Sequence, residues 1–281
     1  MTDAFSLPAQ ADITRAVSQA LEEDIGSGDI TARLIPATRM ATARLVARED
    51  AVLCGRAWCD EVFRQLDDRV EVDWRRGEGE AFVAEELLAV VSGPARALMT
   101  GERTALNFLQ TLSGTATQTR AMVALVSHCA VRLLDTRKTI PGLRLAQKYA
   151  VRVGGGHNHR IGLFDAYLIK ENHILACGGI ESAIATARRQ HPERPVEIEV
   201  RTRQEMERAA VAGADSIMLD NFSEQQIREA VAVNHGRCKL EASGGLAGPS
   251  LARIAETGVD CISVGALTKH CRAVDLSFLL E

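Results

Sequence analysis

Positive charge is concentrated in one stretch of the chain, between Arg132 and Lys170. This stretch holds eight Lys or Arg and two acids, so its formal charge is +6, whereas the whole chain carries −4. Arginine presents a planar fork that binds carboxylate or phosphate groups through paired hydrogen bonds. A cationic cluster in an otherwise acidic protein therefore predicts an anionic small-molecule ligand. We expect the cluster to consist of Arg137, Lys138, Arg160 and Lys170, with His159 beside them.

Two carboxylates offer a different chemistry. Glu199 lies at the end of one apolar run, with Glu197 two positions before it, and Asp220 directly follows the next run. Carboxylate oxygens with no cysteine nearby suit Mg²⁺ that is held jointly with substrate phosphates. The alternative is that both side chains form ion pairs with the cationic cluster.

Glycine turns follow two further apolar runs, at Ser243-Gly244-Gly245 and at Gly265. Backbone N–H groups of such turns can bind a phosphate. The glycine segment at 154–160 lacks the Gly-x-Gly-x-x-Gly pattern and follows no strand, which disfavours a dinucleotide site. It is either a plain loop or a hinge that brings His159 and Arg160 to an anion. No Ser, Cys or Thr has a convincing base beside it, so we expect no covalent catalysis.

A regular alternation of strands and helices must position these residues. Short apolar runs predict strands at 131–134, 166–169, 196–200, 216–219, 239–242 and 261–264, with helical patterns between them. Repeated βα units imply parallel strands with right-handed crossovers, and polar residues gather at the carboxyl ends of such strands. Six units fit either an open doubly wound sheet or a closed barrel, and the periodicity does not choose between them.

The first hundred residues lack this alternation. Helices are predicted at 11–23 and 57–66 and strands at 43–47, 51–54, 70–74 and 87–92, a mixture typical of a small α+β layer domain. Asp12 is the predicted N-cap of the first helix, and Gly26 is expected to end it. A long helical stretch over 102–128, broken near Ser113-Gly114, is expected to link the two parts.

The composition excludes several classes of protein. Apolar residues make up 46% and charged residues 25%, which is typical of a soluble globular protein. The net charge of −4 and an aromatic content of 4% argue against a nucleic-acid-binding protein. No run approaches the roughly 18 apolar residues of a membrane span. The seven cysteines form no Cys-x-x-Cys pair, which indicates reduced thiols and a cytoplasmic location.

Long motifs extend over nearly the whole chain. They are GERTALNF at 101–108, DTRKTIPGLR at 135–144, KYAV at 148–151, NHR at 158–160, LIKENH at 168–173, EIEV at 197–200, MLDN at 218–221 and SVGALT at 263–268. Together they resemble the quinolinate phosphoribosyltransferases, also called carboxylating nicotinate-nucleotide pyrophosphorylases. His157 departs from the small or neutral residue expected at its position.

The resemblance implies a fold and a reaction. The expected fold is an N-terminal α/β sandwich domain over 1–103, joined by the C-terminal tail 267–281, plus an incomplete parallel α/β barrel of fewer than eight strands over 104–266. The expected glycosyltransferase reaction converts quinolinate and 5-phosphoribosyl 1-pyrophosphate (PRPP) to nicotinate mononucleotide, pyrophosphate and CO₂, in NAD biosynthesis. Mg²⁺ would accompany PRPP, with no organic cofactor. The expected assembly is a homodimer with a shared active site, or a higher oligomer built from it.

The resemblance also implies residue roles. The residues expected to bind quinolinate are Arg103, Arg137, Lys138, His159, Arg160 and Lys170, with Arg103 and Arg144 reaching in from the partner subunit. The residues expected to bind PRPP are Glu199, Asp220, Ser243, Gly244, Gly245, Gly265 and Lys269. Glu199 and Asp220 would also bind the Mg²⁺, directly or through water or substrate. The expected catalytic set is Lys138, Lys170, Glu199 and Asp220.

Three alternatives stay open. The chain could be a paralogue associated with molybdenum uptake, or a phosphoribosyltransferase acting on another pyridine carboxylate. Retention of Arg103, Arg137, His159 and Arg160 favours a dicarboxylate substrate. A non-catalytic sensor of phosphate ligands is the alternative from another class, and it would not need both Glu199 and Asp220.

Overall fold

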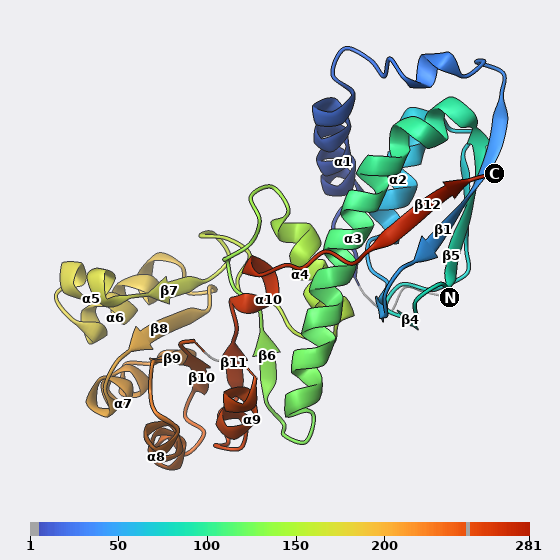
Figure 1. Ribbon diagram of the computed structural model, residues 1–281. Coiled ribbons are helices and arrows are strands. Elements are labelled where there is room, and N and C mark those ends of the chain that lie inside the picture. The colour runs from blue at the N-terminus through green and yellow to red at the C-terminus, as the bar shows by residue number, and fades with distance from the viewer. Residues whose placement is uncertain (1–5, 246–247) are drawn as a thin grey trace. The chain divides into compact units, whose positions relative to one another are not determined.

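The computed structural model describes residues 6–245 and 248–281, which group into two compact units (Figure 1). Unit 1 combines the described part of Met1–Arg120 with Thr139–Gly155 and Thr268–Glu281. Unit 2 combines Ala121–Lys138 with the described part of Gly156–Leu267. No described helix is both long and apolar enough to cross a membrane.

Unit 1 is built on an antiparallel sheet. Its strands are β1 (Met40–Ala47), β3 (Glu71–Trp74), β5 (Leu87–Pro94) and β12 (Leu276–Leu280), in the order β12-β1-β5-β3. Figure 1 shows β12, from the end of the chain, lying beside β1. A short pair, β2 (Ala51–Val52) and β4 (Ala81–Phe82), completes the strands described in this unit.

The helices of unit 1 cover an apolar core. They are α1 (Gln10–Ile25), η1 (Ala32–Leu34), α2 (Arg56–Leu66), α3 (Ala95–Val126), α4 (Arg144–Val153) and the short α10 (Ala266–Lys269). The end of α3, from Ala121, and the start of α10, up to Leu267, belong to unit 2. Helix α1 buries Ile13, Val17 and Leu21, whose spacing of four keeps them on one face. Gly26 ends α1 as predicted. The predicted N-cap is wrong, because Ala9 occupies that position and Asp12 lies in the first turn.

Helix α3 is continuous, so the predicted break near Ser113-Gly114 is wrong. Gly114 serves close packing instead. A Cβ atom there would lie 2.0 Å from the backbone oxygen of Arg272, so only glycine lets the C-terminal segment pass this close to the helix. The same residue type that weakens an isolated helix is here required by tertiary packing.

Unit 2 is a parallel sheet of six described strands flanked by helices. The strands are β6 (Arg132–Leu134), β7 (Tyr167–Ile169), β8 (Val196–Val200), β9 (Ser216–Asp220), β10 (Lys239–Ser243) and β11 (Cys261–Ser263). The helices are α5 (Glu171–Cys177), α6 (Ile180–Gln190), α7 (Arg203–Val211), α8 (Glu224–Asn234) and α9 (Pro249–Ala255).

The strand order decides between the two folds that the periodicity left open. It is β6-β11-β10-β9-β8-β7, so each strand from β8 to β11 lies beside its predecessor and the first strand, β6, pairs with the last, β11. A doubly wound sheet would reverse direction at a switch point, whereas a barrel runs in cyclic order. Among the described residues β6 and β7 do not pair, so the barrel is incomplete, as expected.

The two faces of this sheet differ in polarity. Ile198, Ile217, Leu240 and Ile262 are at most 1% exposed and form the apolar face. The side chains between them in sequence point to the other face. That second face carries most of the polar groups of the strands, namely Glu197, Glu199, Ser216, Asp220, Glu241, Ser243 and Ser263. The pairing of Glu199 with Met218, and of Met218 with Glu241, keeps this polar face in register across three strands.

Candidate active site

The segment that carries His159 is held at the end of β6. Asp135 follows this strand and is fully buried, and its carboxylate accepts hydrogen bonds from the backbone N–H of His159 at 2.9 Å and from the Asn158 side chain. Backbone bonds between Leu133 and His157 and between His157 and Asp135 add two further ties. The glycine-rich segment is therefore an ordered extension of the barrel at this point.

The His159 ring is engaged at both nitrogen atoms. Its Nδ1 accepts a hydrogen bond from the backbone N–H of Arg160 at 2.8 Å. Its Nε2 lies 2.8 Å from a carboxylate oxygen of Glu197 and 3.6 Å from one of Glu241. Since Nδ1 accepts, the proton of a neutral ring is assigned to Nε2, which then donates to Glu197. The ring thus ties the 157–160 segment to the polar face of the sheet.

Glu241 lies deep in this cluster, with a side chain only 3% exposed. Burial is the largest cause and the nearby Glu197 charge the second, and together, against the opposing effect of His159, they raise the pKa of its carboxyl to about 8. Glu241 therefore holds a proton at neutral pH. The cluster consequently does not present two full negative charges to the interior of the barrel.

A pH dependence of stability follows for Glu241. Because its pKa rises on folding from 4.5 to about 8, the folded state binds the proton more tightly. Its contribution to the free energy of unfolding is complete below about pH 4.5 and is lost as the pH rises through about 8. We expect Glu241→Gln to gain stability relative to the wild type between about pH 6 and 9, measured by urea unfolding. Parallel pH curves for the two proteins would contradict this, and Glu229→Gln on the exposed face of α8 is the control.

Two arginines beside this cluster interact electrostatically. The pKa of Arg160 is lowered, first by burial and then by the positive charge of Arg137, while Asp165 and Glu197 act in the opposite direction. Arg160 also donates to the backbone oxygen of Ala166 at 3.3 Å. Like charges held close together are favourable only when an anion neutralises them, which is the property of a carboxylate-binding pocket.

Lys138 lies over the turn that contains Gly265. A Cβ atom at Gly265 would lie 2.9 Å from Cδ and 3.7 Å from Nζ of Lys138, so a side chain there would displace the lysine. The backbone N–H of Lys138 donates to the Thr136 hydroxyl at 3.1 Å, which fixes its main chain. An ammonium beside a glycine turn is a suitable site for a phosphate group.

Glu199 and Asp220 lie on neighbouring strands and on the same polar face. Glu199 forms an ion pair with Lys170, so the ion-pairing alternative holds for this residue. Asp220 lies 4.0 Å from the Arg201 guanidinium, at the outer limit of an ion pair. Two carboxylates on one face could contribute to a divalent ion whose other ligands come from substrate and water, in competition with Lys170 and Arg201.

The Ser243-Gly244-Gly245 turn packs on Asn221. The Asn221 N–H donates to the Ser243 carbonyl at 3.0 Å, and a Cβ atom at Gly244, where φ is +116°, would lie 2.2 Å from the Asn221 side-chain oxygen. We expect Gly244→Ala to raise the KM for PRPP by about tenfold or more through displacement of this turn, because a misplaced donor costs at least one charged hydrogen bond. Steady-state kinetics would measure it.

Gly245 provides the matched control for that variant. Its φ is +60° and a Cβ atom there meets nothing within 4 Å among the described residues. Gly245→Ala should therefore lower the free energy of unfolding by about 1–2 kcal/mol, the penalty of a left-handed alanine, and should raise the KM for PRPP less than Gly244→Ala does. Equal effects of the two substitutions would show that the contact with Asn221 does not set the geometry of the turn.

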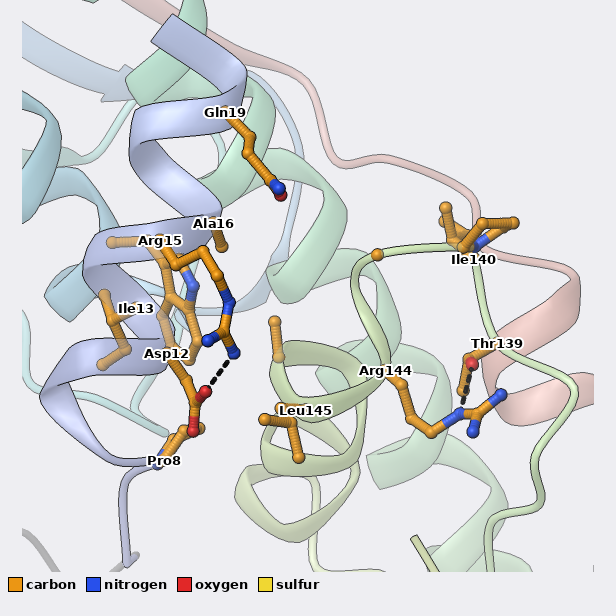
Figure 2. Close-up of a pocket in the computed structure, with 14 residues that line it drawn as sticks. Pro8, Asp12, Ile13, Arg15, Ala16, Gln19, Thr139, Ile140, Arg144 and Leu145 are labelled. Carbon is orange, nitrogen blue, oxygen red and sulfur yellow. Dashed lines mark hydrogen bonds and ion pairs between the residues drawn. The ribbon is translucent and has the colours of Figure 1, made fainter. Parts of the chain in front are cut away.

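Three of the predicted site residues belong to unit 1. Arg103 is exposed on α3, and Lys269 is exposed at the end of α10. Arg144 donates from Nε to the Thr139 hydroxyl at 3.1 Å, and Figure 2 shows its side chain turned toward Thr139 and away from α1. The cavity drawn there has a volume of about 300 Å³ and lies between α1 and the 139–146 segment of the same unit.

The structure brings the other predicted residues together in unit 2. They are Arg137, Lys138, His159, Arg160, Lys170, Glu199, Asp220, Ser243, Gly244, Gly245 and Gly265. Sequence reasoning gave no role to Asp135, Asn221 or Glu241, which hold these residues in place. Polar residues alternate with apolar ones within β8 and β10, and this pattern could have indicated that Glu241 lies on a polar face of the sheet.

The fold is a parallel α/β barrel, and arginines, lysines, carboxylates and glycine turns gather beside its polar face. This combination defines an enzyme that acts on anionic substrates. Two family profiles match the chain: the quinolinate phosphoribosyl transferase N-terminal domain at residues 29–113 and the C-terminal domain at residues 115–279. The chain therefore belongs to the quinolinate phosphoribosyltransferase family.

Individual relatives agree with the family match. The chain is 41% identical to the nicotinate-nucleotide pyrophosphorylase [carboxylating] of Mycobacterium leprae, over 92% of this chain and 94% of that protein. A solved structure of the nicotinate-nucleotide pyrophosphorylase from Francisella tularensis is 47% identical, covers all of both chains and superposes with a TM-score of 0.93. The structure of NadC from Streptococcus pyogenes, 38% identical over 98% of this chain and 99% of that one, gives a TM-score of 0.94.

Proposed function

We propose that this protein is a quinolinate phosphoribosyltransferase, which forms nicotinate mononucleotide, pyrophosphate and CO₂ from quinolinate and PRPP. The family membership supports the reaction, and one observation in the site carries it. Burial and the positive charge of Arg137 lower the pKa of Arg160, and Glu199 and Asp220 lie on the same barrel face. The first pair suits a dicarboxylate, and the second suits a ribose and its metal ion.

The family resemblance assigns the substrates to two groups of residues. Quinolinate is assigned to Arg137, His159 and Arg160, with Lys138 and Lys170 lining its pocket. PRPP is assigned to the glycine turns, with Glu199 and Asp220 at its ribose hydroxyls. Arg103, Arg144 and Lys269 complete these assignments from unit 1. Most of the rate enhancement would come from holding two mutually repelling anions in reacting geometry.

The residues present fit a bound Mg²⁺. Glu199 and Asp220 would hold it, because both offer hard oxygen donors on one face. The ion would supply electrostatic stabilisation of the pyrophosphate leaving group. The chain's own carboxylates favour the positive charge that develops on the ribose as its C1–O bond breaks, and Lys138 and Lys170 stabilise the departing phosphates. No protein nucleophile is needed for loss of CO₂, because the positive charge of the ribosylated ring nitrogen stabilises the electron pair left on C2, which then takes up a proton.

A direct comparison of substrates tests this function. The protein is incubated with PRPP and Mg²⁺ and with either quinolinate or nicotinate, and nicotinate mononucleotide is measured. We expect product from quinolinate and little from nicotinate, because paired arginines select a dicarboxylate. Preference for nicotinate would favour the alternative of a transferase acting on another pyridine carboxylate.

The assembly is proposed to be a homodimer whose partner supplies Arg103, in the reducing environment of the cytoplasm. The family resemblance supports this, as do the exposure of Arg103 and the seven free cysteines. Arg103→Ala and Arg137→Ala should each abolish turnover. Mixed heterodimers should recover up to about a quarter to a half of the activity, because one of their two sites is intact. Heterodimers that form without recovering activity would show that Arg103 acts within its own subunit.

A further inference from the structure

Two buried carboxylates beside His159, those of Glu197 and Glu241, have no role in the reaction described above. Glu197 comes from β8 and Glu241 from β10, and both approach the same nitrogen of His159 across the intervening strand β9. The three side chains are 11%, 10% and 3% exposed. Two carboxylates buried this deeply are costly unless they hold a specific partner.

A metal ion is one partner that three such side chains could bind, since their ligand atoms all lie within 4.8 Å of one another. Protonation disfavours it. Nε2 of His159 carries the proton that it donates to Glu197, and Glu241 also holds a proton at neutral pH. A cation would have to displace both protons, whereas a hydrogen-bonded anchor uses them as they are.

His159 is fixed at three separate points. Its backbone N–H is held by Asp135, its Nδ1 by the backbone N–H of Arg160, and its Nε2 by Glu197. The bond at Nδ1 couples the orientation of the ring to the main chain of Arg160. Release of the ring at Nε2 would therefore loosen Arg160, whose guanidinium interacts electrostatically with Arg137.

We propose that Glu197, assisted by Glu241, is a positioning residue of the quinolinate pocket: it anchors His159 from inside the barrel and thereby fixes Arg160. This inference rests on the proposed function, because Arg160 is assigned to quinolinate there. Glu197 is not expected to touch substrate. Ser216 supports it from β9, by a hydrogen bond of 3.4 Å to the other carboxylate oxygen.

The first experiment compares variants of Glu197. Glu197→Met keeps the volume and loses the acceptor, so the KM for quinolinate should rise about tenfold, as for one lost hydrogen bond to a charged group, with the KM for PRPP within about twofold. Glu197→Gln keeps an oxygen that accepts from Nε2 and should restore the KM to within about threefold. Should Glu197→Met fail to fold, Glu197→Asp replaces it, because its shorter carboxylate cannot reach the ring. Glu229→Gln is the control.

A double-mutant cycle shows whether Glu197 acts through His159. His159→Leu should itself raise the KM for quinolinate, and adding Glu197→Met should then change it by less than about twofold. Multiplicative effects of the two substitutions would overturn the proposal, because they would show that Glu197 acts independently of the ring. Equal rises in both KM values would likewise overturn it, since they indicate a general structural defect.

A spectroscopic measurement separates this proposal from the proposed function. Nitrogen NMR of the imidazole, assigned by comparison with His159→Leu, should show a protonated Nε2 and an unprotonated Nδ1 in the wild type, and this signature should be lost in Glu197→Met. The opposite tautomer in the wild type would overturn the anchor whether or not quinolinate is turned over. A folded wild type that shows the expected tautomer but does not turn over quinolinate would overturn the proposed function. It would also overturn the role of Glu197 in quinolinate binding, and only the structural contact between Glu197 and His159 would stand.

Discussion

Arg160→Ala is expected to lower kcat/KM for quinolinate by about 1,000-fold while leaving the KM for PRPP within about threefold. A guanidinium that holds a carboxylate contributes two charged hydrogen bonds, each worth about 1.5–3 kcal/mol when buried. The Arg160 side chain is half-buried and interacts electrostatically with Arg137. Water that fills the space left by Arg160→Ala would therefore compensate poorly for the lost hydrogen bonds to the carboxylate. Steady-state kinetics with each substrate varied in turn would measure the effect.

Arg132→Ala is the matched control for this variant. Arg132 belongs to the same cationic stretch, but it begins β6 and is exposed, at the opposite end of the strand from Asp135 and Arg137. Its removal should change kcat/KM by less than about twofold. A comparable loss in both variants would mean that quinolinate responds to the overall positive field and not to a defined carboxylate contact.

Asp220→Asn is expected to reduce kcat by about 100-fold or more, with quinolinate binding preserved. The substitution keeps the size of the side chain and removes the charge that would hold Mg²⁺ and favour the developing positive charge on the ribose. Asp220 suits this test better than Glu199, because loss of Glu199 would also release Lys170 from its ion pair. The measurements are kcat over a range of Mg²⁺ concentrations and quinolinate affinity by calorimetry.

Asp68→Asn, at an exposed position after α2, is the control for Asp220→Asn. A requirement for more Mg²⁺ in Asp220→Asn alone would support the assigned role. Unchanged kcat and unchanged Mg²⁺ dependence in that variant would remove Asp220 from the site and would favour the non-catalytic alternative, which does not need it.

The strands of the barrel could be predicted from the sequence because each is a short apolar run with a polar residue at its carboxyl end. The predicted strand at 216–219 and the observed β9 (Ser216–Asp220) differ by one residue. The strand order could not be predicted from periodicity, since it depends on the pairing of β6 with β11, which lie about 130 residues apart. Local periodicity contains no information on which strands pair.

The errors have tertiary causes. Gly114 looked like a helix breaker, but its role is to admit the backbone of Arg272, which only the folded chain brings there. The short β4 and the final strand β12 carry too few residues of alternating pattern to be recognised without their partners. Propensity is a weak guide wherever such long-range packing decides the local structure.

The candidate site could be located but not assembled from the sequence. Residues such as Arg137 and Glu199 lie at or just after the carboxyl ends of predicted strands, which is where active sites of α/β barrels occur. The contact between His159 and Glu197 joins a loop to a strand about 40 residues away, and neither residue type nor spacing reveals it. The roles of these residues stay predictions until the variants are measured.

The most direct test of the central claim is a carbon balance with quinolinate labelled in its C2 carboxylate. The protein is incubated with PRPP and Mg²⁺, and labelled CO₂, pyrophosphate and nicotinate mononucleotide are quantified together. We predict that the three products appear in equal amounts and that the nucleotide carries no label. Folded protein that forms no nucleotide, or a nucleotide that retains the labelled carboxylate, would contradict the account.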